Sequence, residues 1–330
     1  MRFWIRACGM IGGDLEVMLI VPHIQQHPDQ IVSLAEWELD DEFPYLQGAK
    51  PKRIFICPNP PPYGFLIGGH RYLFKEPPGS RAQQIWSEVI AYELSRDLRV
   101  PVPPAFLAHG PSNGAPGVLI EFFYGYASAP EMRFVHAIER FQGLRFPIDF
   151  RRGSLADNIT LCRVHKVSGW RDWWAHTLAF DAIIGNTDRH SENWGFLIQP
   201  AAGPTQYELA PAFDNGTSLG YIIGEPQRAR FTKPDELQRL IERGRHHFGR
   251  VAGDSEGAQH ASLCRTYRER YPSLGSAMDD ALNLTDDRID RLMAWCLRFD
   301  FALPFTQARA KFVAAQLRGR RNALAAALGA

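Results

Sequence analysis

The feature that most constrains this chain is a polar string in its middle, flanked on both sides by apolar segments. The string reads NTDRHSENWG over residues 186–195, and a second acid follows in AFDNG over residues 212–216. Phosphoryl-transfer catalytic loops share this order and spacing: the first Asp orients a hydroxyl, an Asn five positions on holds Mg²⁺, and a later Asp completes the metal site. Asp188, Asn193 and Asp214 are the candidates for these three roles.

The residue types suit this chemistry because Mg²⁺ prefers oxygen ligands and is usually held by one or two carboxylates together with substrate phosphates. Phosphoryl transfer needs mainly positioning and charge neutralisation, which a short rigid loop between ordered elements can provide. Asp and Asn are also common in turns and caps, so a single Asp-x4-Asn match has low specificity. The flanking segments, the second acid and an upstream lysine favour the catalytic interpretation.

The segments on either side of the string have the patterns of regular structure. Arg171 to Ile184 carries apolar residues at helical spacing and predicts a mostly buried helix that ends at Gly185. After the loop, Trp194 to Ile198 predicts a short strand, and Tyr207 to Phe213 predicts a second strand beyond a turn rich in proline and glycine. A helix, a polar loop, a hairpin and an acid therefore follow one another.

The upstream lysine is Lys75, at the end of the aromatic-rich run His70 to Lys75, which predicts a strand with Tyr72 and Phe74 on one face. A strand lysine can contact nucleotide phosphates when a carboxylate on a neighbouring helix steadies its ammonium group. Residues 82–96 have helical periodicity, and Glu88 on this helix is the best candidate for that carboxylate. We expect Glu93 to be a solvated helix charge.

Three segments resemble the HipA-like bacterial kinases, a branch of the protein-kinase-like superfamily. They are LFKEPPGSRAQQIWSEVIAYELSRDLRVPVP (Leu73 to Pro103), FDAIIGNTDRHSENWGFLI (Phe180 to Ile198) and LAPAFDNGTSLG (Leu209 to Gly220). The resemblance implies an α+β, two-lobed kinase fold, with a small antiparallel-sheet lobe and a larger, mainly helical lobe. It also implies ATP and Mg²⁺ as cofactors, and phosphorylation of a Ser or Thr hydroxyl on a protein.

Residue by residue, the resemblance implies that Lys75 contacts ATP phosphates and that Glu88 pairs with it. Asp188 would be catalytic, and Asn193 and Asp214 would bind the metal. The best-known members are toxins that modify a translation-related enzyme, but the resemblance does not carry that substrate to this chain. A protein substrate is expected, and a small antitoxin-like partner is compatible with the resemblance.

Other activities stay open because the string Asp188-Arg189-His190-x-x-Asn193 is also similar to the catalytic loop of phosphatidylinositol kinases. A lipid or small-molecule kinase is the alternative, and a catalytically inactive binding module built on the same fold is a third hypothesis. The later motif reads Phe-Asp-Asn-Gly instead of Asp-Phe-Gly. This order keeps Asp214 but puts in doubt any activation switch that depends on a following Phe.

Several nearby residues have two interpretations. Gly64, Gly68 and Gly69 allow a close backbone approach to phosphates, whereas a simple hairpin turn at Gly68-Gly69 fits equally well. We expect His190 to hydrogen-bond the loop into shape, since Asp188 already serves as proton acceptor. Arg189 either steadies a phosphate or carboxylate through its planar fork or is solvated at the surface.

A strongly apolar run, Val118 to Phe123, predicts the last strand of the small lobe entering a hinge between the lobes. We expect backbone groups near Glu121 and Phe122 to meet the adenine of the cofactor, because hinge recognition needs donors and acceptors more than particular side chains.

The chain has 330 residues, of which 45% are hydrophobic, and this is enough for two lobes. We assign residues 1–50 to an N-terminal extension that either adds strands to the small lobe or covers it, residues 51–123 to the small lobe, and residues 124–330 to the large lobe with C-terminal helices. A formal net charge of +1 gives no basis for direct binding to nucleic acid.

Five cysteines are scattered and odd in number, which fits reduced thiols in a cytoplasmic protein better than disulfides or zinc. No apolar run reaches the roughly 18 residues of a membrane helix, so we expect no membrane insertion. We expect the pair His246-His247 to be a solvated helix end. After Gly220 the chain becomes helical, and helices are predicted to start near Thr232 and Thr285 and to close the chain as a docked terminal helix over residues 306–328.

Overall fold

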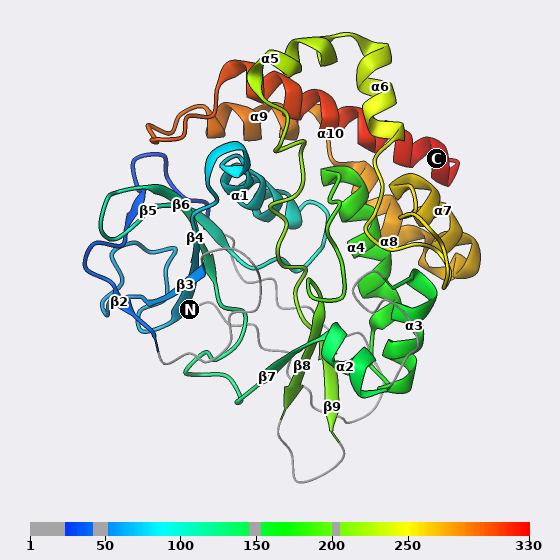
Figure 1. Cartoon of the computed structure of the whole chain (residues 1–330), viewed down its shortest axis with the longest axis horizontal. Helices are drawn as coiled ribbons and strands as arrows, with labels where there is room; N and C mark the ends of the chain where they lie inside the picture. Colours follow the sequence, from blue (N-terminus) through cyan, green and yellow to red (C-terminus); the bar gives the residue numbers. More distant parts are fainter. Residues whose placement is uncertain (1–23, 42–51, 145–152, 200–204) are drawn as a thin grey trace.

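The structure is a computed structural model that describes residues 24–41, 52–144, 153–199 and 205–330. Figure 1 shows a sheet-containing lobe on one side and a larger, mainly helical lobe on the other. The described strands of the small lobe form a six-stranded sheet in the order β1-β5-β6-β4-β3-β2. Their bounds are β1 Val32–Ser33, β2 Glu38–Leu39, β3 Lys52–Ile56, β4 Arg71–Lys75, β5 Ala105–His109 and β6 Pro116–Glu121.

The sheet is antiparallel except at one edge. Strand β1 pairs in parallel with β5, Val32 lying opposite Ala108, whereas every other described pair in this sheet is antiparallel. The expected antiparallel sheet therefore has one parallel edge pair. Parallel strands need a long crossover, and here the chain from β2 through the helix α1 (Gln84–Ser95) provides it. Strands β1 and β2 both come from the segment that precedes residue 51.

The register of β3 and β4 decides which loop lies beside Lys75. Lys52 at the start of β3 is opposite Lys75 at the end of β4, and Ile56 is opposite Arg71. The connection that contains Gly64, Gly68 and Gly69 therefore leaves from the Arg71 end, about 14 Å along the strand from Lys75 at about 3.4 Å per residue. The expectation that these glycines approach the phosphates is wrong. Gly69 instead closes a turn with φ of +71°, its amide donating to the Cys57 carbonyl.

Within the described residues the large lobe contains a three-stranded antiparallel sheet and nine of the helices. Its strands, in the order β7-β8-β9, are β7 Arg133–His136, β8 Gly195–Gln199 and β9 Gln206–Leu209. The helices are α2 Ala137–Gly143, α3 Leu155–Val164, α4 Trp170–Ile184, α5 Glu225–Arg228, α6 Pro234–Glu242, α7 His260–Arg270, α8 Gly275–Asp279, α9 Asp286–Cys296 and α10 Gln307–Leu328.

Helix α4 lies at the centre of this lobe and matches the predicted helix closely. Trp174, Leu178 and Phe180 are buried on it, and it ends at Gly185, which has φ of +65°. A side chain at Gly185 is disfavoured for two reasons. This φ favours glycine, and a Cβ would lie 2.4 Å from the guanidinium carbon of Arg320, which would have to move. The predicted hairpin after the loop is also present as β8 and β9.

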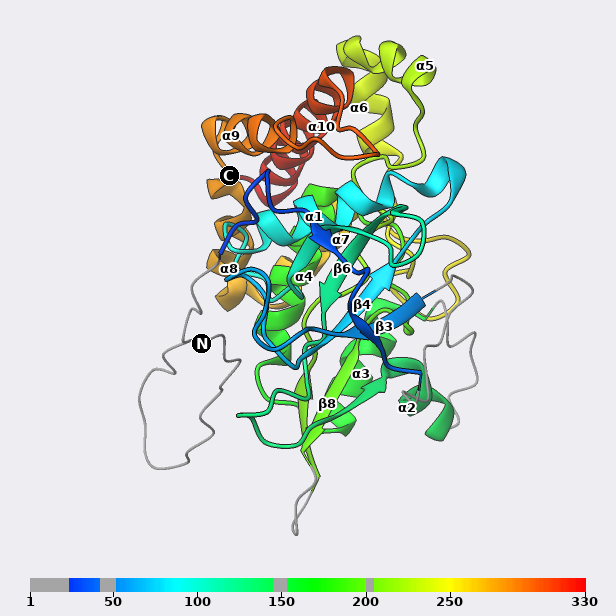
Figure 2. The same ribbon diagram turned by 90° about the vertical axis from the view of Figure 1, so that its left-hand side faces the viewer.

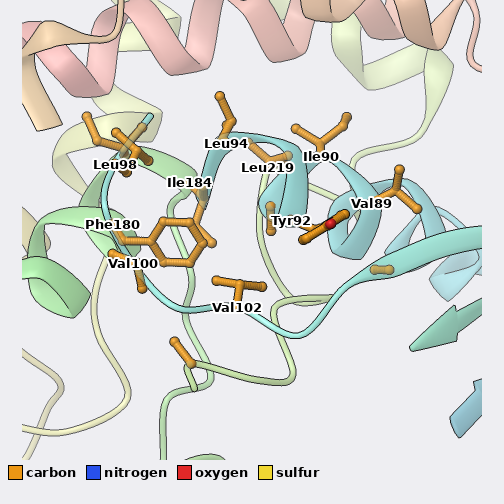
Figure 3. Packing of buried hydrophobic residues seen from close by; sticks show 14 of the residues in the cluster. Val89, Ile90, Tyr92, Leu94, Leu98, Val100, Val102, Phe180, Ile184 and Leu219 are labelled. Carbon is orange, nitrogen blue, oxygen red and sulfur yellow. The ribbon is translucent and has the colours of Figure 1, made fainter. Parts of the chain in front are cut away.

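The two lobes share one apolar core. Figure 3 shows Leu94 of α1 near Ile184 of α4, and Val100 and Val102 of the segment after α1 near Phe180; all of them belong to one buried cluster. Because these side chains exclude water, α1 is held against the large lobe by packing as well as by polar contacts.

The C-terminal part of the chain also holds α1. The indole of Trp86 donates a 2.9 Å hydrogen bond to the Leu303 carbonyl, and its ring contacts Phe299, Phe301 and Phe305. Figure 2 shows α9 and α10 running above α1. The predicted terminal helix is therefore docked, as α10.

Other predictions for the helical region have mixed outcomes. Thr285 caps α9 by accepting the Arg288 amide, as expected, but α6 begins at Pro234 after Lys233, and Thr232 is not its cap. Glu93 is 2% exposed and accepts a hydrogen bond from Gln25, so the prediction of a solvated charge is wrong.

In the part of the chain that the structure describes, no helix is long and apolar enough to cross a membrane. The four cysteines described there are buried and free; Cys8 lies outside it.

Candidate active site

Lys75, Glu88 and Asp214 meet at a pocket between the lobes. The Lys75 ammonium nitrogen lies 2.8 Å from Glu88 Oε1 and 3.0 Å from Asp214 Oδ1. Burial opposes the charged form of Lys75, but the carboxylates of Asp214 and Glu88 outweigh it and raise the pKa of the ammonium group above its usual range. The lysine is therefore a permanent cation at neutral pH.

Glu88 makes a second contact that joins helix α1 to the segment after Asp214. Its Oε1 faces Lys75, and its Oε2 accepts a 2.9 Å hydrogen bond from the backbone amide of Asn215. Ser87, its neighbour on α1, donates to the Ser218 carbonyl at 3.0 Å. Both oxygens of the buried carboxylate are thus used, as a buried charge requires.

Asp214 itself has φ of +57°, in the left-handed region. Few residues other than glycine adopt this conformation, although Asp does so more readily than most. Backbone strain of this kind concentrates at functional sites. Asn215 helps to hold the turn, because its side-chain amide donates to the Ala212 carbonyl at 2.9 Å.

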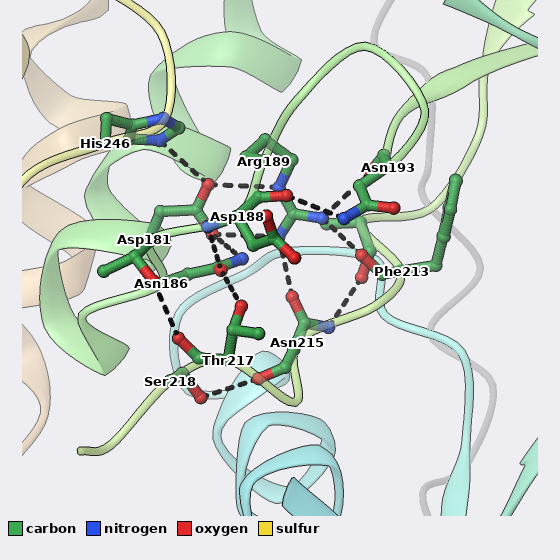
Figure 4. Close-up of polar contacts among 12 residues, drawn as sticks. Asp181, Asn186, Asp188, Arg189, Asn193, Phe213, Asn215, Thr217, Ser218 and His246 are labelled. Carbon is green, nitrogen blue, oxygen red and sulfur yellow. Dashed lines mark hydrogen bonds and ion pairs between the residues drawn. The ribbon is translucent and has the colours of Figure 1, made fainter. Parts of the chain in front are cut away.

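The loop between α4 and β8 carries Asp188 and Asn193, and hydrogen bonds within it fix its shape (Figure 4). The Asn193 side-chain nitrogen donates to the Asp188 carbonyl at 2.7 Å, and the Asp188 amide donates to the Asn186 side-chain oxygen at 3.0 Å. His190 accepts from the Glu192 amide at 3.2 Å, in agreement with the expected structural role.

Arg189 is completely buried and links the two loops that carry the candidate catalytic residues. Its guanidinium pairs with Asp181 on α4, and it donates to the Asn193 and Phe213 carbonyls and to the Asn215 side-chain oxygen. Its planar fork does steady a carboxylate, but the alternative expectation of a solvated surface residue is wrong. Arg189 therefore contributes to the position of Asp214 relative to the Asp188 loop, together with the hydrogen bond from the Thr217 hydroxyl to the Asn186 side-chain oxygen.

Asp181 is the acid beneath the loop, and the sequence interpretation did not include it. Burial opposes its charged form, but Arg189 and His246 outweigh burial and keep its pKa below the usual range. His246 lies 3.1 Å from Asp181 Oδ2 and is 3% exposed, so the expectation of a solvated His246 is wrong. The available signal was an acid within the apolar second half of α4, LAFDAII, because such a residue is rarely buried without a partner.

The backbone groups that were expected to meet adenine at the hinge partly form hydrogen bonds within the chain. Phe122 donates its amide to the Arg71 carbonyl and accepts from the His70 ring at 2.7 Å, and the Glu121 amide donates to the Pro104 carbonyl. The next residue differs: within the described residues, neither backbone polar group of Phe123 has a hydrogen-bond partner. The role of Glu121 and Phe122 in binding adenine stays a prediction.

The residues at the site fit a divalent cation. Asn193 uses its side-chain nitrogen inside the loop, which leaves its carboxamide oxygen as the group for a metal. Asp214 adds a carboxylate that faces the pocket. One carboxamide and one carboxylate oxygen are a suitable protein contribution for Mg²⁺, which takes its other ligands from water and phosphates.

A two-lobed structure with a lysine, glutamate and aspartate cluster between the lobes defines a kinase-like protein. Residues 45–277 match the family described as the HipA-like C-terminal domain. The chain belongs to this family, and the predicted resemblance is confirmed.

Three similarities to known proteins agree with this membership. A segment of 39 residues is 49% identical to the serine/threonine-protein kinase CtkA of Helicobacter pylori, spanning 12% of this chain and 11% of that protein. The crystal structure of the H. pylori proinflammatory kinase CtkA superimposes with a TM-score of 0.68 at 15% identity, over 91% of this chain and 99% of that one. HipA, from the Shewanella oneidensis toxin–antitoxin complex of HipA, HipB and operator DNA, matches with a TM-score of 0.50 at 16% identity, over 88% of this chain and 66% of HipA. These similar structures support the fold.

Proposed function

We propose that this protein is an ATP- and Mg²⁺-dependent phosphotransferase that phosphorylates Ser or Thr hydroxyls of a protein. The observation that carries the proposal is the position of Lys75, which bridges Glu88 of α1 and Asp214 of the metal-binding segment at 2.8 and 3.0 Å. A nucleotide bound between the lobes would present its phosphates to this cation. Family membership and the similarity to CtkA support the choice of a protein acceptor.

In the proposed reaction Asp188 orients the acceptor hydroxyl and takes its proton. The hydroxyl oxygen forms a bond to the γ-phosphorus, and the bond from phosphorus to the bridging oxygen breaks, so that ADP leaves with the electron pair. Mg²⁺, when bound by Asn193 and Asp214, supplies charge neutralisation for the phosphates. Lys75 holds the phosphates, and Glu88 keeps the lysine in place.

The adenine is proposed to bind at the hinge that follows β6. Glu121 and Phe122 fix the hinge backbone through the contacts to Pro104, Arg71 and His70. The amide and carbonyl of Phe123, which have no hydrogen-bond partner among the described residues, are the groups best suited to meet the base, because hinge recognition uses backbone donors and acceptors.

The remaining assignments follow from this function. We propose residues 51–123 as the small lobe, with residues 24–41 adding strands to it, and residues 124–330 as the large lobe. A small antitoxin-like partner is proposed from the similarity to HipA, whose solved complex contains HipB. A cytoplasmic location is proposed because a cytosolic substrate and ATP pool suit this chemistry.

The test is phosphoryl transfer from γ-labelled ATP with Mg²⁺, using fractionated lysate proteins and, separately, phosphatidylinositol vesicles. Wild-type protein should label a protein on Ser or Thr, and Asp188→Asn should label none. Label confined to lipid would reject the protein-kinase proposal in favour of a lipid kinase. No transfer, together with no Mg·ATP-dependent rise in Tm, would favour an inactive binding module.

A further inference from the structure

Two consecutive histidines on the loop between α6 and α7 point to two different acids. His246 lies 3.1 Å from Asp181 beneath the catalytic loop. His247 turns the other way, and its Nδ1 lies 3.8 Å from Oδ1 of Asp188. This loop thus reaches the candidate catalytic residue from a part of the sequence almost sixty positions away.

The Asp188 carboxylate lies next to two imidazoles. His190 Nε2 is 3.5 Å from the same Oδ1 atom, and the centroids of the His190 and His247 rings are 5.1 Å apart. His190 is committed to the loop, because its Nδ1 accepts the Glu192 amide and its Nε2 faces the Asn193 side chain. His247 comes from another element, so its contact with Asp188 depends on the tertiary fold.

His247 differs from His190 in its exposure. The His247 side chain is 28% exposed and that of Asp188 is 32% exposed, whereas His190 is 6% exposed. Asp188 and His247 are therefore both accessible from solvent, whereas His190 is buried. The 3.8 Å separation is longer than a hydrogen bond, and catalytic contacts of this kind often shorten only when the substrate is bound.

We propose that His247 is a positioning residue for Asp188. It limits the rotation of the carboxylate and holds Oδ1, so that the carboxylate faces the incoming hydroxyl. This inference rests on the proposed phosphotransferase function. Small misplacements of a catalytic group can cost about a hundredfold in rate, and loss of His247 should act in this way, through Asp188 and without weakening the nucleotide site.

The test compares His247→Ala, His247→Asn and the control His176→Ala in the full-length protein. Asn keeps a nitrogen donor near the place of Nδ1, so it should restore part of the activity. His176 on α4 lies 3.7 Å from Asp280, a contact of similar length away from the site. His247→Ala should lower kcat about tenfold to a hundredfold, with the KM for ATP and the Tm unchanged, and His176→Ala should behave as wild type.

A second readout does not need turnover. In protein with labelled histidines, Asp188→Asn should shift the imidazole resonances of His247 and leave those of His176 in place. Wild-type turnover by His247→Ala, or a loss that Asn does not restore and that is accompanied by weaker ATP binding, would overturn the inference. If wild type transfers phosphate, Asp188→Asn does not, and His247→Ala is unaffected, only this inference fails. If wild type itself transfers nothing, both it and the proposed function fail.

Discussion

Arg189 and Asp181 form a two-pronged ion pair that is completely shielded from water. Nη2 of the arginine lies 2.9 Å from Oδ1 of the aspartate, Nε lies 3.1 Å from Oδ2, and both side chains are 0% exposed. The aspartate belongs to α4 and the arginine to the loop that carries Asp188, so the pair joins this loop to the most buried helix of the large lobe. This contact anchors the residue next to Asp188, and hydrogen bonds within the loop also hold Asp188.

Removing Arg189 should be costly, because the buried Asp181 carboxylate then loses its arginine partner and keeps only the contacts with His246 and Asn186. We expect Arg189→Met to lower the free energy of unfolding by about 3–5 kcal/mol. The control is Arg318→Met at the exposed contact with Asp290, 2.7 Å long, where the loss should be about 1 kcal/mol or less. Urea unfolding followed by circular dichroism measures both, and equal losses for the two variants would contradict the role of burial.

Asp188 and Asp214 should differ in their effect on nucleotide binding. Asp188→Asn removes the proton acceptor but leaves the proposed metal ligands, so Mg·ATP should still raise the Tm. Asp214→Asn removes a ligand and a partner of Lys75, so this rise should largely disappear. A ligand at a hundred times its Kd stabilises the folded form by about 2.7 kcal/mol, which a thermal-shift assay detects easily. The same Tm rise for both variants would show that Asp214 does not bind the metal.

Local patterns in the sequence were sufficient to predict the helix and strands that carry the candidate site. The helix ending at Gly185, the hairpin after the loop, and the strand with Tyr72 and Phe74 buried are all set by apolar periodicity and glycine over a few residues. The pairing of Lys75 with Glu88 was also within reach, because strand and helix follow closely in the chain and form one unit.

Contacts between segments that are distant in the sequence could not be predicted from local patterns. The interpretation of Glu93 and His246 as solvated groups was wrong, as was the solvated alternative for Arg189, because their partners lie in other parts of the fold and tertiary contacts decide the burial of a charge. For the glycines between β3 and β4 the sequence left a phosphate approach and a simple turn equally open, for a similar reason. Strand register fixes which loop neighbours Lys75, and composition does not reveal register.

His260 should make stability fall at acid pH. Burial, with the nearby His246 and Arg320, lowers the pKa of His260 to about 3, from an ordinary value of 6.5. Between these two values the unfolded chain binds a proton that the folded protein does not, so stability rises with pH across this window. The full contribution is present above 6.5 and decreases as the pH falls.

The measurement is urea unfolding at several pH values for wild type and His260→Asn, which keeps a donor for the Asn186 carbonyl that His260 contacts at 2.6 Å. Between pH 4 and 6 the free energy of unfolding should rise with pH more steeply for wild type than for the variant, by up to about 1.4 kcal/mol per pH unit. Parallel curves would mean that His260 is protonated in the folded protein.

The aromatic contacts around Trp86 should couple the C-terminal segment to catalysis. Phe305 packs against the Trp86 ring at 4.9 Å, and Trp86 lies two residues before Glu88 on α1. Phe305→Ala should cost about 3–5 kcal/mol of stability as a buried aromatic truncation. It should also lower kcat at temperatures where the protein stays folded, because α1 can shift and Glu88 then holds Lys75 less well.

The control is Met278→Ala, a buried truncation in α8 of the large lobe, which should lower the Tm and leave kcat close to wild type. If Phe305→Ala lowers the Tm and spares kcat in the same way, the packing of this segment contributes to stability alone.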